Sequence, residues 1–231
     1  MRLNILYKYI NKLIKIKMKL TLLLLLFIGI SCYMQGCDVS TWDDYNDWAT
    51  ASQYVHFTII RAGYGFGHID DQYETNYANA KANGVKVGAY WYSYASSTSD
   101  AVQEANSIIS ALEGKQFEWP IYYDIEEQSI FDAGIASDIS RAFCDVLEAH
   151  KYYCGIYSST NAFDNYFDDD VKTRYTIWLA HWDVEVPTYK GEYDVWQTGS
   201  GSVPGIGDDV DMDRGFLDFE PIMKKYHLNG Y

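Results

Sequence analysis

Two carboxylates, Asp124 and Glu126, stand two positions apart at the end of a short apolar segment that contains Tyr122 and Tyr123. Residues two apart on a β-strand leave the same face, about 6 to 7 Å apart at Cα. Two close carboxyl groups in a partly dry site do not both ionise readily, so one keeps its proton near neutrality. The pair therefore predicts a general acid beside a stabilising anion, the requirement for splitting a glycosidic bond. The alternative is an ordinary exposed strand-to-loop junction, because 32 acidic residues make such pairs common.

Further acids and several aromatic residues fall near the ends of predicted strands. Asp38 and Asp211 are the acids in question. The chain holds 22 Tyr and 7 Trp, more than a core usually requires, and aromatic faces suit sugar rings. Tyr90, Tyr92 and Trp196 are the first candidates for sugar platforms, with core packing as the alternative. Strand alternation predicts that Trp91 points away from Tyr90 and Tyr92.

The elements that must position these residues alternate along the chain. Apolar, β-branched or aromatic runs predict strands over residues 55–61, 85–94, 120–126, 153–157 and 175–180. Amphipathic stretches between them predict helices over residues 73–83, 99–112, 136–150 and 161–166. After that the helices stop, and short strands at 194–197 and 210–212 flank a Gly/Ser/Pro-rich loop at 199–207. This order favours a single α/β domain with a parallel sheet, most simply an eight-stranded TIM-like barrel that lacks its late helices. An open doubly wound sheet is the alternative.

Seven segments occur in the order found in the glycoside hydrolase family 25 lysozymes, the Chalaropsis-type N-acetylmuramidases, which the chain resembles. They are CDVS (37–40), IIRAGYG (59–65), VGAYWY (87–92), YYDIEE (122–127), WLAHW (178–182), VWQTGSGSVPGIG (195–207) and VDMD (210–213). The resemblance implies a catalytic domain over residues 37–231 with an irregular (β/α)5(β)3 barrel. It also implies hydrolysis of the β-1,4 bond between N-acetylmuramic acid and N-acetylglucosamine in bacterial peptidoglycan.

The same resemblance implies roles for individual residues. Glu126 is similar to the general acid of the family and Asp124 to its assisting partner, while Asp38 and Asp211 match two further acidic cleft positions. Asp213 departs from the family pattern, which often has Asn there, and adds negative charge near the cleft. A lysozyme of this kind needs no cofactor and is expected to act as a monomer. The remaining alternatives are a carbohydrate-binding barrel without catalysis and a chitinase-like hydrolase.

The N-terminus predicts a secretory signal over residues 1–31, with an end as late as residue 36. A basic stretch leads into an eleven-residue apolar run at 20–30, which is too short to span a membrane alone because that takes about 20 residues. Six of the 18 Lys and Arg precede residue 32, which leaves 12 bases against 32 acids. Nucleic acid and anionic membranes are therefore poor partners. We expect a secreted or endolysosomal (phagosomal) protein that has no membrane contact after signal removal.

Cysteines and acidic runs carry weaker predictions. Cys144 and Cys154 are the preferred disulfide pair, because they fall on a predicted helix and the strand after it; two buried thiols are the alternative. No Cys/His grouping suggests zinc, and the spaced acids at 209–213 lack the glycine of a calcium loop, since Arg214 stands there. No metal site is predicted. Residues 168–170, all Asp, are expected to form a solvated loop.

Overall fold

Eight strands close into a barrel in the computed structural model, which describes residue 12 and residues 33–43 and 46–231. Apart from residue 12, the predicted signal segment at 1–31 lies outside the described residues. The barrel strands run in the order β1 (Met34–Val39), β2 (Phe57–Tyr64), β4 (Lys86–Tyr92), β5 (Ile121–Asp124), β6 (Cys154–Ser159), β7 (Thr176–Ala180), β8 (Val195–Val203) and β9 (Gly207–Gly215). β1 pairs with β2 in parallel and with β9 antiparallel, so the sheet returns on itself. The predicted barrel is confirmed, and an open doubly wound sheet is excluded.

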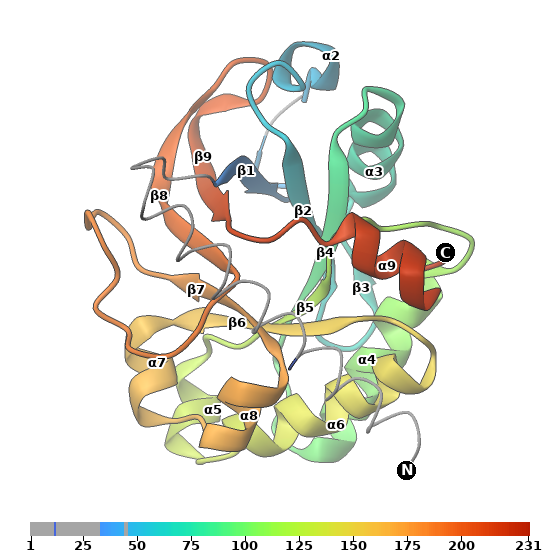
Figure 1. The fold of residues 1–231 in the computed structure, drawn as a ribbon. Coiled ribbons are helices and arrows are strands. Elements are labelled where there is room, and N and C mark those ends of the chain that lie inside the picture. The colour runs from blue at the N-terminus through green and yellow to red at the C-terminus, as the bar shows by residue number, and fades with distance from the viewer. Residues whose placement is uncertain (1–11, 13–32, 44–45) are drawn as a thin grey trace.

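Helices follow each of the first five barrel strands, and one further helix follows the last strand. They are α2 (Trp48–Ala51), α3 (Tyr73–Ala82), α4 (Thr98–Leu112), α5 (Gln128–Asp132), α6 (Ala136–Ala149), α7 (Thr160–Asn165), α8 (Asp169–Arg174) and the C-terminal α9 (Glu220–Tyr226). Residues 176–215 are all described and contain β7, β8 and β9 without a helix between them. This is the predicted (β/α)5(β)3 arrangement, with a two-residue strand β3 (His68–Ile69) added at the end of β2. In Figure 1, α3, α4 and α6 lie outside the ring of strands.

Strand alternation separates two apolar cores. In β5, Ile121 and Tyr123 join the core between the barrel and its helices, whereas Tyr122 joins the core inside the barrel. α6 faces the outer core with Ile139, Phe143 and other residues at helical spacing. Burying each such side chain contributes roughly 1.5 to 3 kcal/mol. The same alternation sends Asp124, the last residue of β5, toward the barrel axis.

One end of the barrel is closed by the C-terminal segment. Phe219, at the N-cap position of α9, and Met223 of α9 are fully buried in the inner core, where Trp119 stacks on Phe57 with ring centroids 3.6 Å apart. Phe219 meets Trp119 edge-on. The other end, where the parallel strands finish, is the end where β5 presents Asp124. Function in barrels of this kind resides at the carboxyl ends of the strands.

The late strands are longer than the sequence predicts. β8 and β9, of nine residues each, form a hairpin that includes most of the segment expected to be a loop at 199–207. The ladder is irregular between Gln197 and Gly199 and between Gly201 and Val203. Glycines in a strand often mark such bulges, and the prediction was wrong because it took them as loop residues.

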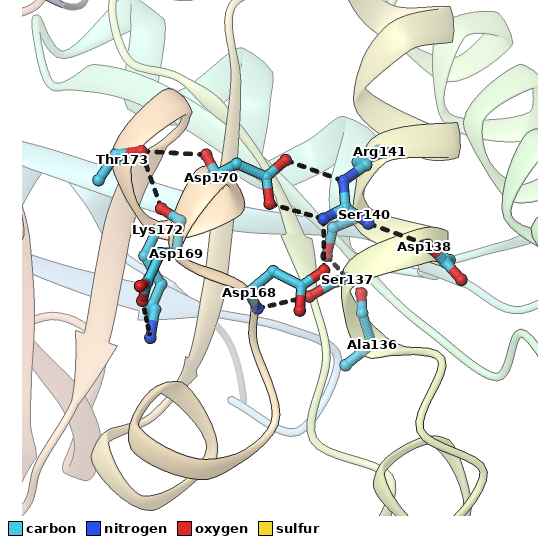
Figure 2. A network of polar contacts seen from close by, with 10 residues as sticks. All are labelled: Ala136, Ser137, Asp138, Ser140, Arg141, Asp168, Asp169, Asp170, Lys172 and Thr173. Atoms are coloured by element: carbon cyan, nitrogen blue, oxygen red, sulfur yellow. Dashed lines mark hydrogen bonds and ion pairs between the residues drawn. The ribbon is translucent and has the colours of Figure 1, made fainter.

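The acidic run at 168–170 is solvated, as predicted, but it is not a loop. Asp168 occupies the N-cap position of α8 without a side-chain capping bond, and Asp169 and Asp170 form the first turn of the helix. Figure 2 shows Arg141 of α6 directed at these acids: its guanidinium contacts Asp170 at 2.6 and 3.0 Å, Asp138 at 2.9 Å and also Asp168. The positive charge of Arg141, a residue distant in sequence, thus offsets part of the negative charge of this run.

The predicted disulfide is present between Cys144 of α6 and Cys154 of β6, with Cα atoms 5.5 Å apart. Cys37 is a free thiol buried in β1, and burial raises its pKa. Trp91 lies in the outer core and donates its indole N–H to the Gly65 carbonyl at 3.1 Å, on the face opposite Tyr90, as alternation predicts. Within the described part of the chain, no helix combines the length and apolar character needed to cross a bilayer.

Candidate active site

A cavity of about 460 Å³, the main pocket, lies where the barrel strands end. It brings together the four acids predicted from the sequence: Asp38 of β1, Asp124 of β5, Asp211 of β9, and Glu126, which lies two residues beyond the end of β5. Its carboxylates are Asp38, Asp43, Asp124, Glu126, Asp209 and Asp211. Arg61 of β2 is the one cation among the described residues of its lining, and Asp70 holds its Nε at 2.7 Å. The pocket is therefore strongly anionic.

The backbone that carries Asp124 and Glu126 is held from both sides. The Asp124 carbonyl accepts from the Ser93 N–H at 3.0 Å, beyond β4, and the Ile125 N–H donates to the Tyr157 carbonyl of β6 at 3.1 Å. The Ser158 hydroxyl donates to the Ile125 carbonyl at 2.6 Å. Ile125 is buried in the outer core, so its two acidic neighbours project the other way, into the pocket.

Both members of this acid pair have raised pKa values. Burial raises the pKa of Asp124 well above its usual range, and the charge of Glu126 adds to the effect, while Arg61 opposes it. One Asp124 oxygen, Oδ1, is buried without a partner among the described residues. Burial also raises the pKa of Glu126, followed by the charges of Glu127 and Asp211. A glutamic acid that keeps its proton toward neutrality is suited to general acid catalysis.

Gln197 of β8 connects the remaining acids. Its Nε2 donates to Asp38 at 2.8 Å and to Asp211 at 3.3 Å. Its Oε1 accepts from the Tyr157 hydroxyl and the Trp182 indole N–H, each at 2.8 Å. Burial raises the pKa of Asp211 to about 6, with Asp43 and Asp209 adding to it. Gln197 is only 2% exposed, so its orientation is fixed by these four contacts.

Two of the three predicted sugar platforms line the main pocket. Tyr90 and Tyr92 do so from β4, and the Tyr92 hydroxyl donates to Glu127 at 2.8 Å. Trp196 does not: it is buried on the outer face of β8, donates to the His181 carbonyl at 2.8 Å, and has the Arg214 guanidinium 4.9 Å from its ring. Trp196 lies outside the main pocket because Val195 and Gln197, its neighbours in β8, take the inward positions.

A second hollow of about 610 Å³, the side pocket, adjoins the main pocket. Glu126 and Tyr157 line both, so Glu126 stands at their junction. Trp182, which is 46% exposed, and His181 line the side pocket together with the hydroxyl and amide side chains after β6. An exposed indole ring among such groups is suited to a sugar face with hydroxyls at its edge.

Several residues of the main pocket escape sequence reasoning. Trp42, which is 83% exposed at the rim, Asp43 and Asp209 lie outside the predicted strands, and Gln197 carries no charge or ring to draw attention. Only the position of Gln197 in β8, two residues after Val195 and on the same inward face, could have indicated this residue. Arg61 could have been found as the inward polar residue at the end of a buried strand.

A buried carboxylate outside both pockets fixes the end of β4. Glu104 of α4 is fully buried and accepts from the Tyr123 hydroxyl at 2.5 Å, the Ser93 hydroxyl at 3.1 Å and the Tyr94 N–H at 2.9 Å. Burial raises its pKa, and these hydrogen bonds oppose the shift. Because the Ser93 N–H binds the Asp124 carbonyl, Glu104 supports the strand ends that carry Tyr92 and Asp124.

Nothing in the described residues forms a group of three or more His, Cys, Asp or Glu side chains able to hold a metal ion. The spaced acids at 209–213 belong to β9, where Asp209 and Asp211 line the main pocket and Asp213 is fully buried. The carboxyl groups of the main pocket can deliver and accept protons, and they can hold a positively charged or strongly hydrogen-bonding ligand.

Comparison with known proteins gives consistent matches over most of the chain. The family model for glycosyl hydrolases family 25 matches residues 37–206. The autolytic lysozyme of Clostridium acetobutylicum is 29% identical over 188 residues, and lysozyme M1 of Streptomyces globisporus is 26% identical over 200 residues. Each alignment covers 78% of this chain, but only 55% and 67% of the two relatives, respectively. The chain thus spans little more than half of the first relative.

Among solved structures, the CTP1L endolysin superposes with a TM-score of 0.71 at 25% sequence identity. That match covers 84% of this chain and 69% of the endolysin.

Proposed function

The chain belongs to glycosyl hydrolase family 25, and from this premise we propose that it is a lysozyme cleaving the β-1,4 bond between N-acetylmuramic acid and N-acetylglucosamine in peptidoglycan. The observation that carries the proposal is the placement of Glu126. It lies at the junction of two hollows, beside Asp124, with its pKa raised by burial and by neighbouring negative charge. A glycan chain can then lie across both pockets with one bond over Glu126.

In the proposed first step, Glu126 gives its proton to the glycosidic oxygen as the bond from that oxygen to C1 breaks. The raised pKa keeps this proton available at mildly acidic pH. Asp124 orients the 2-acetamido group of the same sugar by accepting its N–H. Its buried Oδ1, which has no partner among the described residues, suits that contact. The acetamido oxygen then bonds to C1 and forms an oxazoline, so no protein nucleophile is needed.

In the proposed second step, water attacks C1 and opens the oxazoline. Glu126, now a carboxylate, takes a proton from that water and returns to its starting form. The acetamido group recovers its original bonding, and two displacements at C1 retain the configuration. Asp38 and Asp211 line the sugar site from the opposite strands, with Tyr90 and Tyr92 on the β4 side.

We extend the proposal to the setting in which the protein works. Residues 37–231 would form a monomeric catalytic domain exported by the N-terminal signal, secreted or delivered to an endolysosomal compartment. The proposed chemistry uses carboxyl groups, the substrate's acetamido group and water, and so calls for no cofactor.

The decisive experiment replaces Glu126 by Gln, which keeps the size of the side chain and removes the proton that it delivers. We expect Glu126→Gln to melt like the wild type and to lose about 10³-fold in the release of reducing ends from purified peptidoglycan. Glu113→Gln, an exposed change at the end of α4, is the matched control and should keep full activity. Activity of Glu126→Gln within tenfold of wild type would remove Glu126 from the acid role.

The same assay separates the alternative functions. Wild-type protein that binds peptidoglycan without releasing reducing ends would be a carbohydrate-binding barrel. Faster cleavage of chitin oligomers than of peptidoglycan would indicate a chitinase-like enzyme. Mass spectrometry of the fragments identifies which sugar carries the new reducing end.

A further inference from the structure

Asp213 is a buried acid that the proposed reaction does not use. It lies on β9, is fully buried, and does not line either pocket. Its Oδ1 accepts from the Trp178 indole N–H at 2.8 Å. Its Oδ2 has no described partner that carries a hydrogen. An unsatisfied charged oxygen in a dry interior is costly, so the structure calls for a proton at this position.

The group that faces Asp213 is another carboxyl. Asp213 pairs with Gly36 in the β1–β9 ladder, and Asp38 pairs with Asp211, so the Asp38 side chain lies diagonally beside Asp213 on the same face, next to a position that carries no side chain. Asp38 is itself 93% buried. Asp38 already accepts from Gln197 at 2.8 Å. Two carboxylates in contact repel each other, whereas a carboxylic acid facing a carboxylate forms a strong charge-assisted hydrogen bond.

Among the described residues, the surroundings of the pair offer negative charge and no ion pair to either carboxyl group. Asp211 and Cys37 lie next to Asp213 and Asp38, and Asp43 adds its charge from the loop after β1. From the other strands, Trp178, Gln197, Tyr90 and Tyr122 face the pair with neutral groups. Two described arginines lie near the pair in sequence or in the pocket, and both contact other groups. Arg61 forms an ion pair with Asp70, and Arg214 packs over the rings of Tyr33 and Trp196 on the outer face.

We propose that Asp38 and Asp213 share one proton, with Asp213 as its main carrier, and that Asp213 is thereby a positioning residue for the active site. The donor is Asp213 because it is the more deeply buried of the two. Asp38 then stays an anion that accepts two hydrogen bonds, one from Asp213 and one from Gln197. Because the Gln197 N–H group points at Asp38, its carbonyl must point at Tyr157 and Trp182.

The pH dependence follows from this arrangement. Burial and the facing charges raise the pKa of both Asp38 and Asp213, so the folded pair binds a proton that the unfolded chain releases near pH 4. The stability that this proton provides is complete below that pH and is lost as pH rises through the raised pKa of the pair. Asp213→Asn would donate an N–H to Asp38 at every pH and would remove this loss.

The first test does not depend on activity. We expect the Tm of Asp213→Asn, relative to wild type, to rise by roughly 3 to 5 °C per pH unit between pH 5 and the pKa of the pair. Asp208→Asn, an exposed change near the hairpin turn, should follow the wild type throughout. Infrared spectra of wild-type protein with ¹³C-labelled aspartate should show a protonated carboxyl band at neutral pH, and its intensity should fall by one carboxyl group in Asp213→Asn. Parallel melting profiles without a lost carboxyl band would overturn the proposal.

The second test rests on the proposed function and asks whether the proton positions the site. Asp213→Asn should keep activity within about threefold of wild type at pH 5 and should hold that activity further up the alkaline limb than wild type does, until Glu126 itself loses its proton. Asp213→Leu fills the space without a donor and should lower kcat at least tenfold at pH 5. A shared loss in both variants with unchanged pH limbs would mean a packing role only. If the wild type proves inactive on peptidoglycan, the melting and infrared results still decide the shared proton.

Discussion

Gln197 shows how one side chain can orient several others. An amide has two donors and two acceptor positions, and here all four are in use, toward Asp38, Asp211, Tyr157 and Trp182. A buried group satisfied in this way has no alternative orientation of similar energy. The two acids of the main pocket and the ring of the side pocket are consequently fixed by a single residue.

Gln197→Glu tests this role with almost no change in size. The new carboxylate cannot donate to Asp38 or Asp211 and would add charge beside them, so we expect kcat/KM on peptidoglycan to fall about 10- to 100-fold. The measurement is steady-state release of reducing ends at pH 5. Gln103→Glu, the same change on the exposed face of α4, should leave kcat/KM unchanged. Equal activity of Gln197→Glu and wild type would show that the four contacts do not matter for catalysis.

At this scale the sequence predicts charged and aromatic site residues better than neutral polar ones. An acid at the end of an apolar strand is unusual, and this signal indicates the pocket residues Asp38, Asp124, Glu126 and Asp211. Gln197 and Trp42 give no such signal. For Trp196, one residue of register in β8 decides which face the side chain takes.

Among the elements, α8 depends on a contact between distant segments. Its acidic first turn lies against Arg141 of α6, which contacts Asp138, Asp168 and Asp170 (Figure 2). The acids are well exposed, so solvent screens these ion pairs and their net contribution is small. The network connects α8 to α6, and none of its residues lines either pocket.

Arg141→Ala should therefore affect stability and not catalysis. We expect a loss of about 1 kcal/mol, or a Tm lower by roughly 2 to 4 °C, with activity on peptidoglycan unchanged. Added salt should narrow the difference from wild type, because it screens the pairs. Lys172→Ala, which removes a pair to an Asp169 side chain that is 97% exposed, should change Tm by far less. A Tm difference that does not respond to salt would assign the effect to packing of the Arg141 side chain instead.

The sequence predicts elements well where periodicity is strong and poorly where special residues interrupt it. The helix at 136–149 and the strand at 121–124 follow directly from buried positions at regular spacing. The hairpin of β8 and β9 does not, because Gly199 and Gly201 are paired within the strands, beside two irregularities of the ladder. The start of α4 is also displaced: Ser97 caps it by accepting from the Asp100 N–H, where the pattern indicated residue 99.

For the molecule as a whole, charge and pKa act in the same direction. Beyond residue 31 the chain has 12 basic and 32 acidic residues, so it is strongly anionic near neutrality. Bacterial walls are anionic as well, which disfavours approach at low salt. The proposed acid Glu126 must also be protonated, and that form is lost as pH rises through its raised pKa.

We therefore expect wall lysis at low salt to have its optimum below pH 7. Added salt should extend activity upward in pH by screening the repulsion, up to the limit that Glu126 sets. The measurement is a pH profile of peptidoglycan cleavage at two ionic strengths. A short uncharged oligosaccharide substrate serves as the control, because it should lose the salt effect and keep the Glu126 limb. A low-salt optimum above pH 7 would contradict both arguments.

The architecture was predictable because the β/α order is written locally, strand by strand. Closure of the barrel through β1, β2 and β9 rests on pairing between residues far apart in sequence, as in Asp38 opposite Asp211. The sequence predicts this closure only because alternating strands and helices favour a barrel. The placement of Asp213 beside Asp38 follows from the same pairing.

The hairpin of β8 and β9 limits how this gene can change length. Gln197 stands on one strand and Asp211 on the other, and a single inserted or deleted codon that no bulge absorbs would turn the following side chains of that strand to the opposite face. Point substitutions on the exposed positions are tolerated by comparison. Descendants of this sequence should therefore vary in length at the turn of residues 204–206, or by compensating pairs, and keep the spacing of the strands themselves.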